Sequence, residues 1–329
     1  MHWKRRRYLI RAFRKSRELS RVAHRVEKIK PDDHLLFATM RNEAVRLPYF
    51  LEYYRALGID HFLIVDNASD DGSAQLLQDQ PDVSLWTTRH SYKASRFGMD
   101  WLNALLFKFG AGHWCMTVDA DELFTFPHSD GRQLTDLTSW LDDQSIGMMG
   151  ALMLDLYPKG PVADCKYVRG ADPVKVLSNF DAGTYRAKRQ PLLKNLWVQG
   201  GVRERVFFHD TPKKSPTLNK IPLIKWRRSY AYVNSTHSAL PRRLNAAYID
   251  FDGNSVISGA LLHTKFLDIV VREARQEKQR REHFGDSAIF DAYYDAIAAN
   301  PELWCETSLK YEGTDQLEKL GLINSGTWK

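Results

Sequence analysis

Residues 61–72 read His-Phe-Leu-Ile-Val-Asp-Asn-Ala-Ser-Asp-Asp-Gly, an apolar run that ends in an acidic turn. A short apolar run bounded by turn-forming residues is typical of a strand buried on both faces of a parallel sheet. Asn, Asp, Ser and Gly favour the turn, which also supplies an N-cap for a helix expected over residues 73–78. The stretch therefore predicts a strand, a polar loop and a helix in succession.

Similar apolar runs lie on either side of this stretch, and helical patterns separate them. The runs cover residues 34–40, 83–88 and 114–118, and further helices are expected over residues 47–57 and 94–109. Pro48 is tolerated in the first turn of the earlier helix, and Gly58 suits its C-terminal cap. Because strands alternate with helices, we predict an α/β fold with a mostly parallel, Rossmann-like sheet and helices on both faces.

Polar residues follow each of these runs. They occupy positions 41–43 after the first run, 66–71 at the end of the second and 119–122 after the fourth. In doubly wound sheets, ligands bind beyond the carboxyl ends of the strands, near the point where the strand order reverses. We therefore expect the functional site at this edge of the sheet.

The most specific of these endings is the triplet Asp119-Ala120-Asp121. Alternate residues of an extended segment point to the same side, so both carboxylates can be directed at one point. Two like charges so close raise a pKa unless a cation lies between them. Mg²⁺ or Mn²⁺ accepts one or two carboxylates together with phosphate oxygens, which predicts a metal-bound diphosphate. The alternative is a solvated turn, where such triplets are also common.

Glycine-rich phosphate loops are absent from the sequence. Neither Gly-x-Gly-x-x-Gly nor Gly-x-x-x-x-Gly-Lys-Ser/Thr occurs. The absence argues against a dinucleotide-dependent dehydrogenase and against a P-loop NTPase.

Several motifs, in this order, resemble the family 2-like glycosyltransferases of bacteria, which have a GT-A fold. The resemblance is detailed over residues 34–126 and looser to about residue 266. It implies a metal-dependent, inverting sugar transfer. The motifs are Arg-Asn-Glu at 41–43, Leu-Pro-Tyr-Phe at 47–50, Tyr-Tyr-Arg-Ala-Leu-Gly-Ile-Asp-His at 53–61, Val-Asp-Asn-Ala-Ser-Asp-Asp-Gly-Ser at 65–73, and the run from 114 to 123 that contains Asp-Ala-Asp-Glu.

The resemblance also assigns residues. Asp119 and Asp121 would hold Mn²⁺ or Mg²⁺ on the diphosphate, with Glu122 close by, and Arg96 would face the nucleotide. This assignment is chemically sensible, because the cation neutralises charge that grows on the leaving nucleoside diphosphate. By similarity, the nucleotide-binding residues would be Arg41, Asn42, Glu43, Asp66, Asp71, Arg96 and Asp119.

An inverting transfer needs a general base that deprotonates the acceptor hydroxyl. The chain departs here from the commoner family pattern, because it has neither the later Glu-Asp base motif nor the Gln-x-x-Arg-Trp sequence of processive synthases. Asp155, after an apolar run at 151–154, and Glu204, within 200–206, are the candidates for this base. The alternative for each is an ordinary salt bridge.

Two histidines and four basic residues complete the candidates. His263 follows an apolar run and is predicted to be a metal ligand, and His237 is a second candidate; either could instead be a satisfied core histidine. The basic residues could contact phosphate or an acidic acceptor, or simply keep the surface soluble. They are Arg203, Arg205, Lys220 and Lys225.

The basic character of the chain belongs to its N-terminus. Residues 1–30 hold twelve Lys or Arg and two Glu, a net charge of +10, so the other 299 residues sum to −3 of the total +7. A nearly neutral body argues against nucleic acid as a partner. Apolar residues recur among the arginines, which predicts a basic amphipathic helix able to lie on an anionic membrane surface. The alternative is a solvated helix that packs on the body.

These observations divide the chain into three parts. We expect a helical basic arm over residues 1–32, a GT-A domain over 33–265 and a helical C-terminal tail over 266–329. The domain would comprise a nucleotide-binding half (33–126) and an acceptor half (127–265). The run Arg272–Arg281, with its alternating charges, suits an exposed helix, and no segment is apolar enough to span a membrane or to act as a secretory signal.

The function expected from the sequence is a metal-dependent glycosyltransferase in polysaccharide synthesis at the cell envelope. It would move a sugar from a nucleotide-sugar donor to a glycan or lipid-linked acceptor, in the cytoplasm or on the inner face of the membrane. One alternative is a sugar-nucleotide nucleotidyltransferase, which should carry a glycine-rich basic loop where this chain has Arg-Asn-Glu. Another is a non-enzymatic membrane scaffold, which would not need carboxylates at several strand ends.

Overall fold

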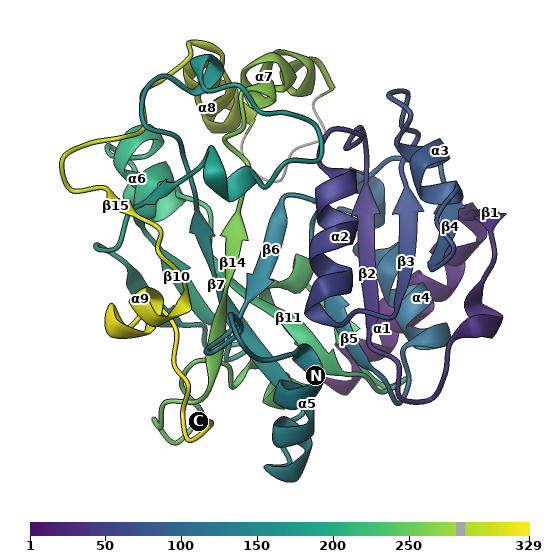
Figure 1. The fold of residues 1–329 in the computed structure, drawn as a ribbon. Helices are drawn as coiled ribbons and strands as arrows, with labels where there is room; N and C mark the ends of the chain where they lie inside the picture. The colour runs from purple at the N-terminus through teal and green to yellow at the C-terminus, as the bar shows by residue number, and fades with distance from the viewer. Residues whose placement is uncertain (281–286) are drawn as a thin grey trace.

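The computed structural model describes residues 1–280 and 287–329, and Figure 1 shows a large sheet that crosses the molecule between helices. In the described residues, nine strands form this sheet in the order β1-β4-β3-β2-β5-β11-β7-β14-β6. Their bounds are β1 Ser20–Ala23, β2 Leu35–Met40, β3 His61–Asp66, β4 Val83–Thr87, β5 Trp114–Thr117, β6 Glu122–Thr125, β7 Met148–Asp155, β11 Asn219–Lys225 and β14 Ser258–His263.

The sheet is mixed and mostly parallel. Strands β4, β3, β2 and β5 are parallel to one another, and so are β7 and β14. The remaining pairs are antiparallel, and they involve β1, β11 and β6. Six of the nine strands therefore run in one direction, which confirms the predicted α/β fold class.

Helices cover both faces of the parallel strands. The side chains of β2 alternate, so that Leu36 and Ala38 face one core cluster while Leu35 and Phe37 face another. The first cluster includes residues of α2 (Leu47–Leu57) and α5 (Leu134–Asp143), and the second includes residues of α4 (Met99–Phe109). Burial of both faces explains why these strands appear in the sequence as continuous apolar runs.

Helix boundaries follow local sequence signals in the first half. Helix α2 begins with Pro48 in its first turn and ends at Gly58, whose φ of 110° is readily reached by glycine. Helix α3 spans Ser73–Gln78, as predicted. The helix predicted over 94–109 begins only at Met99, which corrects that boundary. A 3₁₀ turn over Lys93–Ser95 precedes it, and residues 96–98 all have positive φ.

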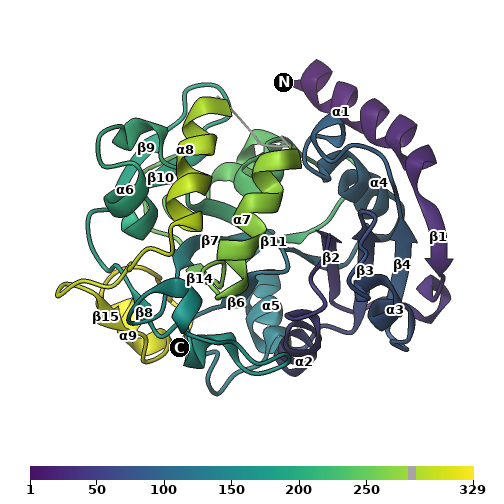
Figure 2. The same ribbon diagram turned by 90° about the horizontal axis from the view of Figure 1, so that it is seen from above.

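The N-terminal region is part of the body. Helix α1 (His2–Lys15) lies beside α4, as Figure 2 shows at the outer edge of the molecule, and Arg11 Nη2 is 2.8 Å from Asp100 Oδ2. Strand β1 pairs with β4 and extends the central sheet. The arm predicted over 1–32 is thus helical over His2–Lys15, but it packs on the body, through α4 and through the pairing of β1 with the sheet.

The two predicted halves of the domain share the same sheet. Strand β11 lies between β5 of the first half and β7 of the second, and β14 pairs with β6. Further elements of the second half are β8 (Asn179–Phe180), β9 (Arg186–Arg189), β10 (Leu196–Gln199), α6 (Gly201–Phe207), β12 (Ala231–Tyr232) and β13 (Ala239–Leu240).

The C-terminal region also packs into the body. It contains α7 (Ile269–Arg280), α8 (Ser287–Ala298), β15 (Leu309–Lys310) and α9 (Thr314–Lys319). Strand β15 pairs with β8, and Trp328 is buried against Phe126 and Trp140, the latter from α5. Most side chains of the charged run at 272–281 lie outside the described residues. No helix among the described residues combines the length and the apolar composition needed to cross a membrane.

Gly259 lies where β14 approaches β6 too closely for a side chain. A Cβ atom at this position would lie 2.4 Å from the carbonyl oxygen of Thr125. We predict that Gly259→Ala lowers the free energy of unfolding by about 1–3 kcal/mol, measured by chemical denaturation, because backbone must shift. Gly147→Ala is the control, since nothing lies within 4 Å of its Cβ position. Equal stability of the two variants would contradict the prediction.

Candidate functional site

A cleft of about 1830 Å³ lies beyond the ends of β2, β3, β6, β7 and β14. One wall comes from the loops after β2, β3 and β4, with the loop after β12 beside them, because Arg96 donates to the Val233 carbonyl oxygen. Across β14 and β6, a second wall comes from β10 and the segment before β11 (Figures 1 and 2). Helix α7 contributes a further side. The lining residues used below are Arg41, Asn42, Glu43, Arg46, Asp71, Arg96, Asp119, Asp121, Glu122, Trp197, Gln199, Arg203, Lys213, Lys214, Lys220, His237, His263 and Glu273.

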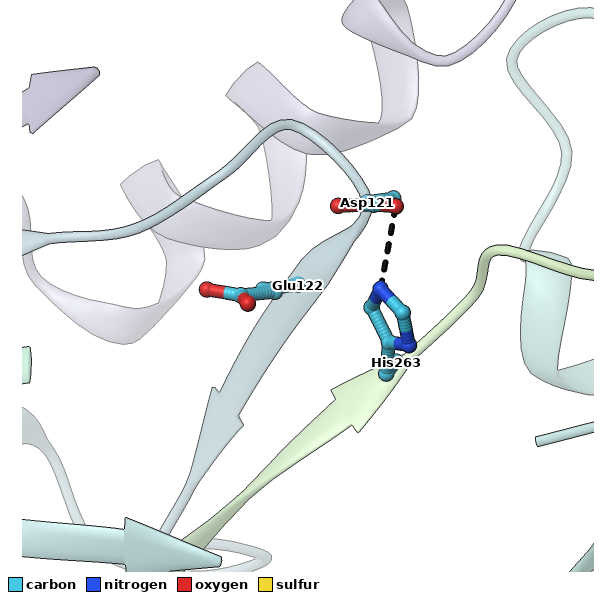
Figure 3. Close-up of side chains that lie close together, drawn as sticks. All are labelled: Asp121, Glu122 and His263. Carbon is cyan, nitrogen blue, oxygen red and sulfur yellow. Dashed lines mark hydrogen bonds and ion pairs between the residues drawn. The ribbon is translucent and has the colours of Figure 1, made fainter. Parts of the chain in front are cut away.

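The strand register brings an acid and a histidine together at the centre of this cleft. His263, the last residue of β14, lies opposite Asp155 of β7 on one side and Glu122 of β6 on the other. The Nδ1 atom of His263 is 2.5 Å from Asp155 Oδ1, and its Nε2 atom is 3.1 Å from Asp121 Oδ2. Figure 3 shows the imidazole pointing at Asp121. The arrangement is a line of two carboxylates bridged by one imidazole.

Electrostatic pairing holds this line in place. Burial alone would raise the pKa of Asp121, but attraction to His263 outweighs it and leaves the pKa well below its usual value. Burial lowers the pKa of His263, and the two carboxylates more than reverse this effect. Asp155 Oδ2 also accepts a hydrogen bond from Arg203 Nε at 2.7 Å, and the pKa of Asp155 is lowered despite its burial.

Lys220 pairs with the other two acids of the segment 119–122, Asp119 and Glu122. Its Nζ atom is 2.7 Å from Asp119 Oδ2, and it also donates to the carboxylate of Glu122. Burial raises the pKa of Glu122 to about 7, with Lys220 acting in the opposite direction. The pKa of Lys220 is raised, because its two acidic partners outweigh the effect of burial. Lys220 therefore pairs with two carboxylates at once and offsets part of their negative charge.

The structure contradicts the predicted geometry of Asp119 and Asp121. Residues 120 and 121 form a turn, in which the Glu122 N–H donates to the Asp119 carbonyl oxygen at 3.1 Å. The segment is not extended, so the two side chains do not converge on one point. Asp119 pairs with Lys220, whereas Asp121 pairs with His263.

A different set of residues fits a divalent ion. Asp121, Glu122 and His263 each offer one ligand atom, and these atoms lie within 4.8 Å of one another. Glu122 already pairs with Lys220, so Asp121 and His263 are the better placed ligands. Asp155 would accept the Nδ1–H proton of a neutral His263 and leave Nε2 for the metal, as carboxylates behind metal-binding histidines commonly do. An imidazole ligand suits Mn²⁺ better than Mg²⁺.

The loops predicted to bind the nucleotide are tied to each other. The side-chain oxygen of Asn42 accepts the N–H of Asp70 at 2.9 Å, and Asp71 accepts the N–H of Ala44 at 2.9 Å. Asp71 also accepts bonds from Ser73, and together these bonds lower its pKa against the effect of burial. Asn42 and Asp71 thus fix one wall of the cleft.

Three other predicted nucleotide residues have mainly protein contacts. Asp66 is buried at the end of β3; its Oδ2 accepts the Ser69 N–H, whereas its Oδ1 has no partner within the described residues. Asp66 does not line the cleft. Glu43 pairs with Arg46 at 2.8 Å, and burial raises its pKa to about 7. Arg41 donates to the carbonyl oxygen of Asn67.

Arg96 lines the cleft but binds other parts of the protein. Its Nε donates to Asp100 Oδ1 at 2.8 Å, its Nη1 donates to the Val233 carbonyl oxygen at 2.8 Å, and its guanidinium lies 4.1 Å from the Tyr8 ring centroid. It therefore joins α1, α4 and β12. Its proposed contact with a nucleotide remains a prediction.

Neither predicted general base is free to accept a proton. Asp155 is buried between His263 and Arg203. Glu204 does not line the cleft and forms a two-point pair with Arg186, at 2.6 and 2.7 Å. Structural roles fit both residues better. Arg205 and Lys225 likewise pair with Asp181 and Asp142, outside the cleft lining.

Sequence reasoning missed Arg46, Trp197 and Glu273. Arg46 is buried beside Glu43, and its Nε has no partner in the part of the chain that the structure describes. Glu273 comes from α7, more than 200 positions away, and burial raises its pKa. The position of Arg46 just before a helix was the only available signal, whereas nothing local marked Trp197 or Glu273.

Comparisons with known proteins do not place the chain in a family. No family model matches the sequence, and neither does any curated protein. Among solved structures, a 4-diphosphocytidyl-2C-methyl-D-erythritol synthase is 14% identical with a TM-score of 0.25; the match covers 39% of this chain and 64% of that one. A UTP-bound UGPase from Acinetobacter baumannii is 9% identical with a TM-score of 0.28, covering 82% and 84%. Scores this low support no inference about function.

His237 makes stability depend on pH. Its Nδ1 is 2.6 Å from the Asn219 carbonyl oxygen, and burial lowers its pKa to about 4. In the unfolded chain His237 is protonated below about pH 6.5, whereas in the folded chain it stays neutral down to about pH 4. The free energy of unfolding therefore falls as the pH falls through this window. We predict a loss of about 2 kcal/mol between about pH 7.5 and 5 that His237→Gln removes.

Denaturation at both pH values measures this difference. His209→Gln is the matched control, because His209 is exposed. It should keep the pH dependence of the unmodified protein. If His237→Gln keeps the full dependence too, the buried neutral histidine is not its source.

Proposed function

We propose that this protein is a metal-dependent glycosyltransferase that uses a nucleotide-sugar donor. The observation that supports this proposal is the contact between Asp121 and His263 at the centre of a cleft, between two walls of different composition. Polar and acidic loops after β2 and β3 form one wall, and basic and aromatic residues contribute to the other. A donor bound along the first wall would present its diphosphate to Asp121 and His263.

The metal site follows from the same contact. Mn²⁺ or Mg²⁺ held by Asp121 and His263 would neutralise charge on the leaving nucleoside diphosphate. Asp155 orients the imidazole through Nδ1, and Arg203 balances the charge of Asp155. Lys220 keeps Asp119 and Glu122 paired, which limits the repulsion among the acids of the motif.

The remaining details of the reaction rest on the resemblance. Inversion at the anomeric carbon and a glycan or lipid-linked acceptor belong to this proposal, as does action at the inner face of a membrane. The resemblance supplies the roles of Asn42 and Asp71 toward the nucleotide, and their hydrogen-bonded loops provide a fixed wall for it.

A sugar-nucleotide nucleotidyltransferase is the second candidate. The names of the two solved structures, a synthase and a UGPase, fit this class better than a glycosyltransferase, but their TM-scores are too low to decide between the two classes. The loop after β2 argues against it, because it reads Arg-Asn-Glu and contains no glycine. The two reactions release different products. Transfer from a nucleotide sugar releases a nucleoside phosphate, whereas nucleotidyl transfer from a nucleoside triphosphate to a sugar phosphate releases pyrophosphate.

Metal-dependent nucleotide binding tests the site. In thermal unfolding with UDP, GDP or CMP, with and without Mn²⁺, we expect one nucleotide to raise the melting temperature only with the metal. Asp121→Asn should abolish this gain, because it removes the ligand opposite His263. Asp252→Asn, in an exposed turn, is the matched control and should retain it. A gain that is unchanged in Asp121→Asn would contradict the metal assignment.

The exposed side of α1 supports the proposed membrane contact. Trp3, Ile10 and Phe13 are 83%, 44% and 67% exposed, and Arg6, Arg7 and Arg14 are exposed among them. Their spacing by three, four and seven residues places them on one side of the helix, away from Ala12, which is buried. Arginines interleaved with a Trp and a Phe suit anionic headgroups.

We predict that Trp3→Ala with Phe13→Ala weakens binding to anionic phosphatidylglycerol vesicles by about tenfold, measured by co-sedimentation. Point changes are preferable to deletion of residues 1–30, because deletion would also remove β1 from the sheet. Leu192→Ala is the control, since Leu192 is exposed elsewhere. Unchanged binding of the double variant would remove the membrane role from α1.

A further inference from the structure

A Trp and two Lys residues lie together on the wall opposite the nucleotide loops. Strand β10 alternates, so that Leu196 and Val198 are buried while Trp197 and Gln199 line the cleft. Trp197 is 42% exposed, which is unusual for so large an aromatic side chain. The 3₁₀ turn over Pro212–Lys214 lies next to it and adds two exposed lysines to the lining.

Hydrogen bonds fix this wall relative to the metal residues. The Leu218 N–H donates to the Val198 carbonyl oxygen, and the Met153 N–H donates to the Leu218 carbonyl oxygen, both at 2.7 Å. Met153 lies on β7, two residues before Asp155. The Gln199 amide donates to the carbonyl oxygens of Lys213 at 3.2 Å and Ser215 at 2.6 Å, which holds the lysine turn against the strand.

The positive charge of this wall is not compensated. Within the described residues, Lys213 and Lys214 form no ion pair, and the nearby Glu204 already pairs with Arg186. The lysines therefore remain available to an anion that enters the cleft. Trp197 adds an apolar face beside them, which can pack against the apolar face of a sugar ring.

We propose that Trp197, Lys213 and Lys214 form an acceptor subsite for an anionic sugar, meaning a glycan residue that carries a carboxylate or a phosphate. This inference rests on the proposed glycosyltransferase function, and it names the acceptor class for the same cleft. The donor does not compete for this wall, because β10 and the loops assigned to the nucleotide, after β2 and β3, lie on either side of β14 and β6 (Figures 1 and 2). A neutral sugar would leave both ammonium groups without a partner.

Direct binding tests the subsite with glucuronic acid, glucose 6-phosphate and glucose as probes, in the presence of Mn²⁺ and of UDP, GDP or CMP in turn. The readouts are saturation-transfer NMR and tryptophan fluorescence. We expect one or both charged sugars to bind roughly fivefold more tightly than glucose, with a preference that decreases as salt increases. The charged sugar that binds more tightly identifies carboxylate or phosphate as the recognised group. Equal affinity for all three sugars would overturn the proposal.

Two pairs of variants separate charge from stacking. Lys213→Ala with Lys214→Ala should remove the preference for charged sugars without weakening the binding of glucose. Lys213→Arg with Lys214→Arg should keep this preference. Trp197→Ala should weaken the binding of all three sugars, and Trp197→Phe should retain part of this binding. A charge preference that survives loss of both lysines would contradict the assignment.

The same samples distinguish failure of the subsite from failure of the proposed function. All these variants should keep the metal-dependent nucleotide shift, because none of the changed residues contacts Asp121 or His263. A normal nucleotide shift without selective sugar binding overturns the subsite alone. Selective sugar binding without any nucleotide shift overturns the glycosyltransferase function and leaves an anionic-sugar site.

Discussion

The burial of charged side chains at one level of the central sheet is the constraint on which the cleft depends. Register places Asp155, His263 and Glu122 side by side on β7, β14 and β6. A buried charge is costly unless a partner compensates it. Arg203 pairs with Asp155, Lys220 pairs with Glu122, and Asp121 pairs with His263. The orientation of each charged group at the centre is therefore set by its neighbour.

This pairing separates the groups that can meet a ligand from those that support them. Asp155 and Glu122 are enclosed, whereas Asp121 and Asp119 reach the open part of the cleft. His263 connects the enclosed acids with the accessible ones, because one ring nitrogen faces the buried Asp155 and the other faces Asp121. A site with one buried and one accessible carboxylate on the same imidazole is well suited to position an ion, and poorly suited to use Asp155 as a base.

The two walls of the cleft come from distant parts of the chain and have different chemistry. The loops after β2 and β3 are locked by bonds through Asn42 and Asp71. The opposite wall is tied to β7 through Val198, Leu218 and Met153. Strand β11 joins these parts into one sheet and also carries Lys220 into the centre. The same strand thus provides both the connection between the walls and the ammonium group that pairs with two acids.

The fold class and the place of the site followed from the sequence by itself. Buried parallel strands require continuous apolar runs, and turn residues such as those at 66–72 stop them, so β2 to β5, α2 and α3 were predictable from local signals. Glu43, Asp119, Asp121 and His263 lie at or just after the ends of apolar runs, so the sequence also indicated that they line the cleft. The roles of Asp119, Asp155 and Glu204 were not predictable, and neither was the membership of β1 in the sheet. Only the tertiary structure decided which carboxylate faces His263, which faces Lys220 and which is held by an arginine. Strand periodicity and turn propensity are properties of neighbouring residues, whereas charge pairing joins residues that are 48 to 142 positions apart in the chain.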